Sequence, residues 1–274
     1  MIKKTIHLSD IHIRTFKRHE EYRVILSSLF ENIKEKVKGY DREEIRIVVV
    51  GDLLHNKINI SNEQSVLLAW FLKELVSIAP LIVVAGNHDL LENNKDRLDS
   101  ITPVVDILGI PDIKYYKESK CYVDDNIVWN NYSIFEGNRR PEIEEARREY
   151  GDKKTYIGLF HGPLLSAETD LGYVFEHGMG LDEFLGNDIV MLGDIHKRSS
   201  FTLLDGEKTI PLVFPGSLII QDFGESLSNH GYLFWDLETR TYEEINIESE
   251  YGFYKFKITS LDDLDNNKEV LVNE

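Results

Sequence analysis

Two short motifs, far apart in the chain, place an acid and an imidazole at the same spacing. LSDIHIR, residues 8–14, and LGDIHKR, residues 192–198, are each an apolar run that ends in Asp-x-His. In an extended segment, residues i and i+2 point to the same side, so both side chains can be directed at one ion. Asp10 with His12, and Asp194 with His196, therefore have the spacing of paired metal ligands.

Three further motifs between these two carry the same kinds of donor atom. They are Gly51-Asp52, Gly86-Asn87-His88-Asp89 and His161. Carboxylate, imidazole and amide oxygen together suit divalent first-row metals of intermediate hardness, such as manganese. A glycine precedes Asp52, Asn87 and Asp194, and glycine lets the backbone turn tightly and approach a site.

Each of these motifs follows a short apolar run that must position it. The runs lack clear alternation and most are rich in Val and Ile, which predicts strands buried on both faces. They span residues 5–9, 45–51, 80–86, 156–160 and 188–193, and they end at Asp10, Asp52, Asn87, His161 and Asp194. Functional groups of layered α/β folds collect at the carboxyl ends of strands, so we expect these five side chains at one edge.

Helices are predicted between these strands. Residues 20–38 have amphipathic helical spacing, and Ser61 with Gln64 resembles a capping box ahead of a second helix. That helix is apolar around much of its circumference, which predicts either a partner subunit on one side or deep burial. Shorter helices are expected over residues 102–109 and 141–150. After residue 208 the runs IPLVF, GYLFWDL, RTYEEINI and FYKFKI predict strands of a second sheet that packs against the first.

Composition limits the classes of protein. The 274 residues, 42% hydrophobic and 29% charged, fit one large soluble domain or one with a small appendage. No apolar run approaches the ~18 residues of a membrane helix, and no secretory signal is seen. The single cysteine, Cys121, has no motif around it and is expected to be structural; it suits a reducing, cytoplasmic (intracellular) location. The net charge of −17 argues against nucleic acid unless positive charge is local.

The ordered set of motifs resembles the calcineurin-like metallophosphoesterase superfamily. This resemblance implies an α/β, four-layer αββα sandwich of two mixed sheets with two divalent metal ions, most simply Mn²⁺. By position, Asp10, His12 and His196 hold one metal, Asn87, His161 and Asp194 hold the other, and Asp52 bridges them. The family has a histidine where this chain has Asp194, so we expect metal binding to persist and the catalytic rate to be lower.

Two further features resemble the SbcD-type double-strand-break repair nucleases. His55 stands in GDLLHN, where that branch carries a DNA-contacting histidine, and residues 214–226 read FPGSLIIQDFGES. The branch implies a manganese-dependent 3′–5′ exonuclease and endonuclease, a homodimer and an SMC-like ABC-type ATPase partner. Residues 1–248 would form the nuclease domain. Residues 249–274 would be the incomplete start of a capping domain or a C-terminal tail, and the usual ATPase-docking segment is not visible.

The resemblance also implies roles around the metals. His88 would stabilise the transition state or protonate the leaving group, Asp89 would orient His88 or cap a helix, and His55 would contact the scissile phosphate region. His7 is expected to be structural, and His19, His177 and His230 to lie on the surface or in loops. Basic residues that follow the metal motifs form either a positive collar for DNA or an ordinary mixed-charge surface: Arg14, Lys17, Arg18, Lys57, Lys95, Arg97, Lys197 and Arg198.

Two alternatives to the nuclease stay open. The first is a phosphatase or cyclic-nucleotide phosphodiesterase of the same fold. The second is a metal-binding structural subunit with little activity, which the unusual Asp194 favours.

Overall fold

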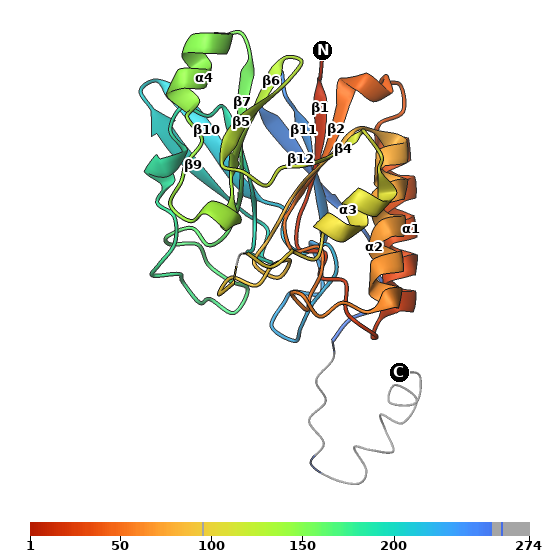
Figure 1. Ribbon diagram of the computed structural model, residues 1–274. Helices are drawn as coiled ribbons and strands as arrows, with labels where there is room; N and C mark the ends of the chain where they lie inside the picture. Colours follow the sequence, from red (N-terminus) through yellow and green to blue (C-terminus); the bar gives the residue numbers. More distant parts are fainter. Residues whose placement is uncertain (95, 254–258, 260–274) are drawn as a thin grey trace.

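The computed structural model describes residues 1–94, 96–253 and 259, and it contains two six-stranded mixed sheets (Figure 1). The first sheet has the order β12-β11-β1-β2-β3-β4 and the second β5-β6-β7-β8-β10-β9. The strands of the first sheet are β1 (Lys4–Leu8), β2 (Ile45–Val50), β3 (Leu81–Val84), β4 (Ile113–Tyr115), β11 (Gly231–Asp236) and β12 (Thr241–Asn246). Those of the second are β5 (Lys120–Asp124), β6 (Ile127–Tyr132), β7 (Thr155–His161), β8 (Ile189–Gly193), β9 (Ser199–Asp205) and β10 (Lys208–Phe214).

Helices cover the outer faces of both sheets. The first sheet carries α1 (His19–Lys36), α2 (Asn62–Ile78) and α3 (Thr102–Leu108), and the second carries α4 (Ile143–Tyr150), on the opposite side of Figure 1. One hydrophobic core lies under α1, α2 and α3, another between the sheets, and a third under α4. The predicted four-layer αββα sandwich is confirmed. None of the helices within the described residues is long and apolar enough to cross a membrane.

The predicted strands exist, but their distribution differs from the prediction. The five apolar runs do not share one sheet, because β1, β2 and β3 are parallel neighbours in the first and β7 and β8 in the second. The late strands do not make a second sheet of their own, since β10 pairs with β8 while β11 pairs with β1. All but the first residue of FYKFKI lies outside the described residues.

Strand β6 was missed because asparagines interrupt its apolar run. All six of its residues are buried. Asn130 Nδ2 donates to Asn187 Oδ1 at 2.7 Å, and Asn131 Nδ2 donates to the Glu118 carbonyl at 2.9 Å. Hydrogen bonding of this kind offsets the cost of burying an amide, so polar residues can occupy a central strand.

The predicted helices are confirmed, including the capping box of α2. The Gln64 N–H donates to Ser61 Oγ, and the Gln64 side chain accepts from the Ser61 N–H. Gln64 Nε2 also donates to the Ile13 carbonyl, which ties this helix start to the first Asp-x-His motif. Helix α2 lies against α1, α3 and β3. These contacts bury one side of its wide apolar face, whereas Val66 is 60% exposed, so burial and a partner subunit both stay open as explanations.

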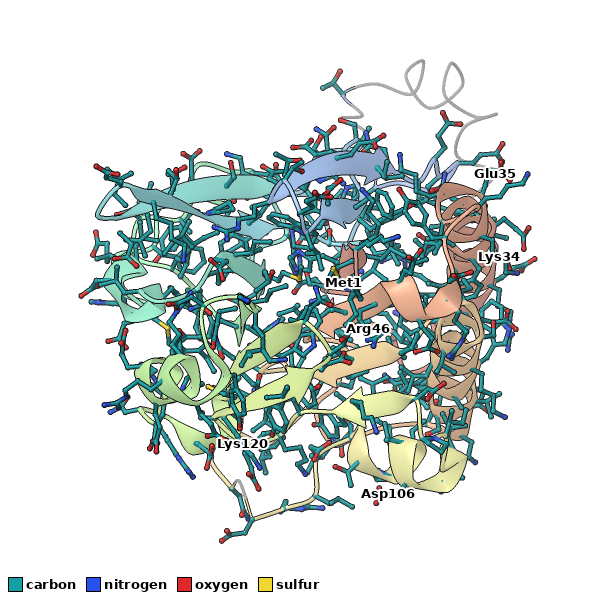
Figure 2. All side chains as sticks on the ribbon, turned by 90° about the horizontal axis from the view of Figure 1, so that it is seen from above. Met1, Lys34, Glu35, Arg46, Asp106 and Lys120 are labelled. Atoms are coloured by element: carbon teal, nitrogen blue, oxygen red, sulfur yellow. The ribbon has the colours of Figure 1, made fainter. Side chains whose placement is uncertain are left out.

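Two interactions join the sheets at opposite ends of the strands. At the amino ends, Arg46 of β2 donates through Nε and Nη2 to both carboxylate oxygens of Asp124 in β5, at 2.7 and 2.8 Å. Figure 2, viewed onto this end, shows Arg46 in the middle of the molecule and Lys34 and Glu35 on its outer edge. Towards the carboxyl ends, His7 Nε2 of β1 donates to the Leu192 carbonyl of β8 at 3.0 Å. The sandwich is therefore tied by polar contacts at both ends.

His7 should make the fold sensitive to acid. Burial lowers its pKa to about 3, below the ordinary value of 6.5, so protonation favours the unfolded chain. Its contribution to stability is complete above pH 6.5 and declines as the pH falls from 6.5 towards 3. We expect the His7→Gln protein to show a flatter decline in the free energy of unfolding, measured in urea between pH 6.5 and pH 4, than the wild type.

The matched control is His177→Gln, which changes an exposed histidine. An identical decline in the wild type and the His7→Gln protein would contradict a neutral buried His7.

Candidate functional site

Folding brings the two Asp-x-His motifs to the same place, at the carboxyl ends of the parallel strands in both sheets (the lower end of Figure 1). Asp10 follows β1 and Asp52 follows β2, while His161 ends β7 and Asp194 follows β8. The Nε2 atoms of His12 and His196 lie 3.0 Å apart. The Asp194 N–H donates to the carboxylate of Asp10 at 3.1 Å. The repeated motif therefore forms two halves of one site.

Asp52 occupies the centre of this cluster. Its Oδ2 lies 3.3 Å from His12 Nε2, and its Oδ1 lies 3.3 Å from His161 Nε2. His161 Nε2 is also 3.2 Å from Asn87 Oδ1 and 3.8 Å from Asp194 Oδ1. The two oxygens of Asp52 thus face different groups of donors, as a bridging carboxylate would.

Carboxylate and imidazole ligand atoms converge here in overlapping groups. Ligand atoms of Asp10, His12 and His196 lie within 4.8 Å of one another, and so do those of Asp10, Asp52 and His161. Asp10 is thus close to both groups, while Asn87 and Asp194 approach the second group through His161. All seven predicted ligands are in one cluster.

Unusual backbone angles aim these side chains. Asp10, His12, Asp52 and Asp194 have φ of 54°, 49°, 53° and 102°, a left-handed region that non-glycine residues seldom adopt. Such conformations cost about 1–3 kcal/mol each and concentrate at functional sites. Glycine is required nearby, because a Cβ at Gly193 would lie 2.0 Å from the Val50 carbonyl oxygen. The expected role of this glycine in close approach is confirmed.

Hydrogen bonds on the outer side of two histidines fix which nitrogen faces the cluster. His161 Nδ1 is 2.8 Å from the Val50 carbonyl, and His196 Nδ1 is 2.5 Å from Glu225 Oε1. Because these oxygens accept, each Nδ1 carries a proton, and each ring in its neutral form turns the lone pair of Nε2 inwards. Metal-ligating histidines are usually held in this way.

The buried carboxylates of the cluster stabilise the protonated forms of its histidines. Burial opposes ionisation, yet the hydrogen bond to Glu225 and the charge of Asp10 raise the pKa of His196 to about 9. The carboxylates, Asp52 above all, also hold the pKa of His161 well above its usual value against burial. Burial raises the pKa of Asp194 to about 6. Positive charge is therefore stabilised at this point, and the converging oxygen and Nε2 atoms fit divalent cations.

His88 and His55 lie side by side next to this cluster. Their ring centroids are 5.3 Å apart with an interplanar angle of 23°, and the His12 ring lies 4.9 Å from that of His88. His88 Nδ1 donates to the His55 carbonyl at 2.8 Å, while its backbone N–H donates to Asp52 Oδ1. Burial, followed by the adjacent Arg14 guanidinium, lowers the pKa of His55 to about 4.

Asp89 has neither of its predicted roles. Its buried carboxylate accepts the backbone N–H groups of Gly86, Leu53 and Leu54 at 2.9, 3.3 and 2.9 Å. The His88 ring is bonded to His55 instead, and the cap position of α3 is Ile101. Asp89 therefore ties the loop after β2 to the loop after β3 and holds the backbone of both motifs.

Most of the predicted positive collar is engaged within the protein. Arg18 pairs with Glu21, Lys57 with Glu92 at 2.8 Å and Lys197 with Glu168 at 3.1 Å. Arg198 has a side chain that is 5% exposed and donates to the Pro215 carbonyl and to Asn246, so it is structural.

The remaining basic residues are less constrained. Lys17 and Arg97 are exposed, Arg14 binds His55, and Lys95 lies outside the described residues. These loops thus have the mixed-charge surface that was the alternative to the collar.

Sequence reasoning missed the residues that hold the ligands from behind. Glu225 binds His196, and Ser9 Oγ donates to Asp10 at 2.5 Å. Glu225 lies in the FGES segment, whose likeness to a branch motif is the one signal in the sequence that could have pointed to it. The remaining histidines and Cys121 lie outside the cluster, and burial raises the pKa of the Cys121 thiol to about 11, which fits an unreactive group.

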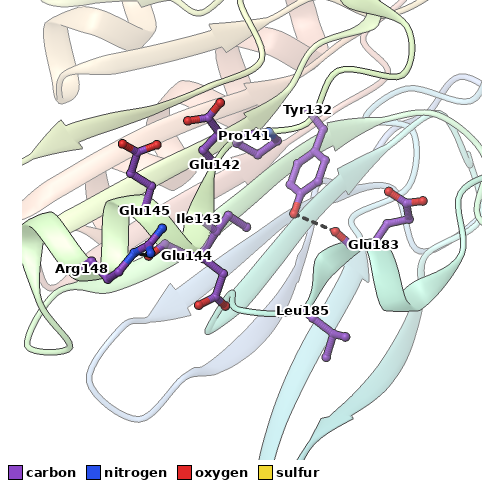
Figure 3. Close-up of a pocket in the computed structure, with 9 residues that line it drawn as sticks. All are labelled: Tyr132, Pro141, Glu142, Ile143, Glu144, Glu145, Arg148, Glu183 and Leu185. Atoms are coloured by element: carbon purple, nitrogen blue, oxygen red, sulfur yellow. Dashed lines mark hydrogen bonds between the residues drawn. The ribbon is translucent and has the colours of Figure 1, made fainter.

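Two surface hollows differ in how close they lie to the cluster of predicted ligands. One of about 250 Å³ borders the cluster and is lined by Thr169, Asp170, Leu171, Phe175, Asp194, Ile195, His196, Lys197, Asp222, Gly224 and Glu225. The other, about 570 Å³, lies beside α4 and includes four glutamates and one arginine (Figure 3). The second contains none of the predicted site residues, whereas the first includes Asp194 and His196. The first is the natural approach to the cluster.

Glu225 should strengthen metal binding through His196. Replacing Glu225 by Gln removes the charge that makes Nε2 a better donor, so we expect a manganese affinity about tenfold lower, as is typical when such partners are lost. Calorimetric titration of Mn²⁺ into chelator-treated protein measures this affinity. Glu168→Gln, the same change in the exposed pair with Lys197, should bind manganese like the wild type. Equal affinity for all three proteins would show that Glu225 does not support the ligand.

Comparison with known proteins agrees with this geometry. The sequence model described as calcineurin-like phosphoesterase matches residues 3–246. The chain is also 38% identical over 264 residues to "Uncharacterized protein R555" of Acanthamoeba polyphaga mimivirus; the match covers 94% of this chain and 19% of that protein. The chain thus spans about a fifth of the length of this relative. With its clustered carboxylates and imidazoles, the chain belongs to the calcineurin-like phosphoesterase family, whose members hydrolyse phosphoesters with divalent metals.

Proposed function

We propose that this protein is a manganese-dependent DNA nuclease that hydrolyses phosphodiesters by 3′–5′ exonuclease and endonuclease activity. The observation that carries the proposal is the placement of His55 against His88, with ring centroids 5.3 Å apart, beside the metal ligands. His55 occupies the position of a DNA-contacting histidine in the SbcD-type branch that the sequence resembles. The resemblance alone supports the further proposal of a homodimer that acts with an SMC-like ATPase.

The protein groups have distinct roles in this reaction. The seven clustered ligands would hold two divalent cations, which would supply positive charge for the phosphodiester and make bound water a stronger nucleophile. Because His88 Nδ1 donates to the His55 carbonyl, Nε2 is the ring atom left to exchange a proton with the substrate. A His88 ring that carries a second proton on Nε2 can transfer this proton to the leaving sugar oxygen and so act as the general acid.

A second function within the family is favoured by the surface charge. The net charge is −17, and Lys57 and Lys197 are paired with glutamates. A small phosphodiester or phosphomonoester needs less positive surface than DNA, which binds through several phosphates. A phosphatase or cyclic-nucleotide phosphodiesterase is therefore the alternative.

The nuclease proposal predicts manganese-dependent shortening of end-labelled duplex DNA from its 3′ ends. We expect digestion with Mn²⁺, weaker digestion with Mg²⁺ and none with chelator. His88→Ala should lower the rate about 10²- to 10⁴-fold, the usual contribution of a proton-transfer group. His177→Ala is the control because His177 is exposed and outside the cluster. Hydrolysis of bis(p-nitrophenyl) phosphate with no DNA cleavage would instead support the small-ester function.

Asp194 should limit the rate. With it, three carboxylates (Asp10, Asp52 and Asp194) face two divalent cations; a histidine there would leave two carboxylates and a more positive site. We therefore expect Asp194→His to preserve or raise DNA cleavage at saturating Mn²⁺. A protein that binds two manganese ions but cleaves neither substrate, with or without this substitution, would indicate a structural subunit.

A further inference from the structure

The FGES segment, residues 223–226, belongs to a longer loop that contacts both sides of the site. Glu225 Oε1 accepts from His196, while Oε2 accepts from Ser217 Oγ at 2.8 Å and from the Gln221 N–H at 3.0 Å. Gln221 in turn accepts from Arg14 Nη2 through its carbonyl at 3.0 Å and its Oε1 at 3.2 Å. A continuous series of hydrogen bonds therefore runs from a metal ligand to Arg14.

Arg14 connects this series to His55. Its Nη1 lies 3.1 Å from His55 Nε2. A guanidinium carries only donors, so His55 Nε2 must accept the hydrogen bond, and the proton of the neutral ring must be on Nδ1. His55 Nδ1 is buried and has no hydrogen-bond partner in the described part of the chain. Nothing else among these residues competes with Arg14 in setting the tautomer.

The orientation of His55 matters because His88 depends on it. The His55 and His88 rings stack, and the His88 ring also donates to the backbone carbonyl of His55. Gln221, which holds Arg14, is 4% exposed and is itself fixed by donating from Nε2 to the Ile219 carbonyl at 2.7 Å. Arg14 is thus an arginine held on both sides rather than a free cation awaiting phosphate.

We propose that Arg14, anchored by Gln221, is a positioning residue that holds His55 as the neutral Nδ1–H tautomer and fixes the ring plane against which His88 stacks. The tautomer rests on the structure alone, and its effect on rate rests on the proposed function. Arg14 acts on the reaction through His55 and His88. Its predicted direct contact with DNA would require it to give up these bonds.

The decisive variant is Arg14→Met, which keeps the aliphatic stem but removes every donor. Long-range ¹H–¹⁵N NMR of the imidazoles, recorded with Mg²⁺ because manganese broadens resonances, reports the tautomer of His55. We expect the Nδ1–H pattern in the wild type and its loss in Arg14→Met. Lys17→Gln, which removes one positive charge from the same exposed loop, should keep the wild-type pattern.

Kinetics separate positioning from general support of the fold. Arg14→Met should lower kcat about 10- to 100-fold, with manganese affinity unchanged, as when a supporting partner of an active-site group is lost. The rate is measured on whichever of DNA and bis(p-nitrophenyl) phosphate the wild type cleaves, so failure of the nuclease proposal is seen separately. Gln221→Ala should give a smaller effect in the same direction and serves if Arg14→Met does not fold. An Nε2–H tautomer in the wild type, or an unchanged Nδ1–H pattern in the variants, would overturn the proposal.

Discussion

The buried carboxylate of Asp52 is the constraint on which the rest of the site depends. One of its oxygens faces His12, from the loop after β1, and the other faces His161, from the end of β7. These strands belong to different sheets. A buried charge of this kind is tolerated only with close partners of opposite charge, so the two sheets must meet in one register. To bring these side chains together, Asp10, His12, Asp52 and Asp194 adopt left-handed backbone conformations, which are unfavourable in free energy.

Much of this arrangement could be predicted from the sequence, because each ligand follows directly after an apolar run that reads as a buried strand. The repeated Asp-x-His spacing and the glycines before Asp52 and Asp194 identified the cluster without any knowledge of the fold. The division of the strands between two sheets could not be predicted, since a buried parallel strand has the same apolar pattern in either sheet. Strand β6 was hidden by Asn130 and Asn131, whose Nδ2 groups find their acceptors only through tertiary contacts.

The charged residues were the least predictable part. A lysine or arginine beside a metal motif has the same appearance in a sequence whether it is free or paired, and Lys57, Lys197 and Arg198 are paired with residues distant in the chain. Asp89 was assigned to its neighbour His88, whereas it binds the backbone of a loop more than thirty positions earlier. Local sequence cannot distinguish such cases, because the partner is set by the tertiary fold.

The two ends of the sandwich are joined by different kinds of bond. At one end Arg46 and Asp124 form a permanent ion pair within the chain. At the other end the ligands come from both sheets, and the carboxylates of Asp10 and Asp52 converge with the imidazoles of His161 and His196. Binding of divalent ions is therefore thermodynamically linked to the cohesion of the two sheets, and occupancy of the centre adds to the stability of the fold. The concentration of these ions would then affect the stability of the folded protein as well as its rate of catalysis.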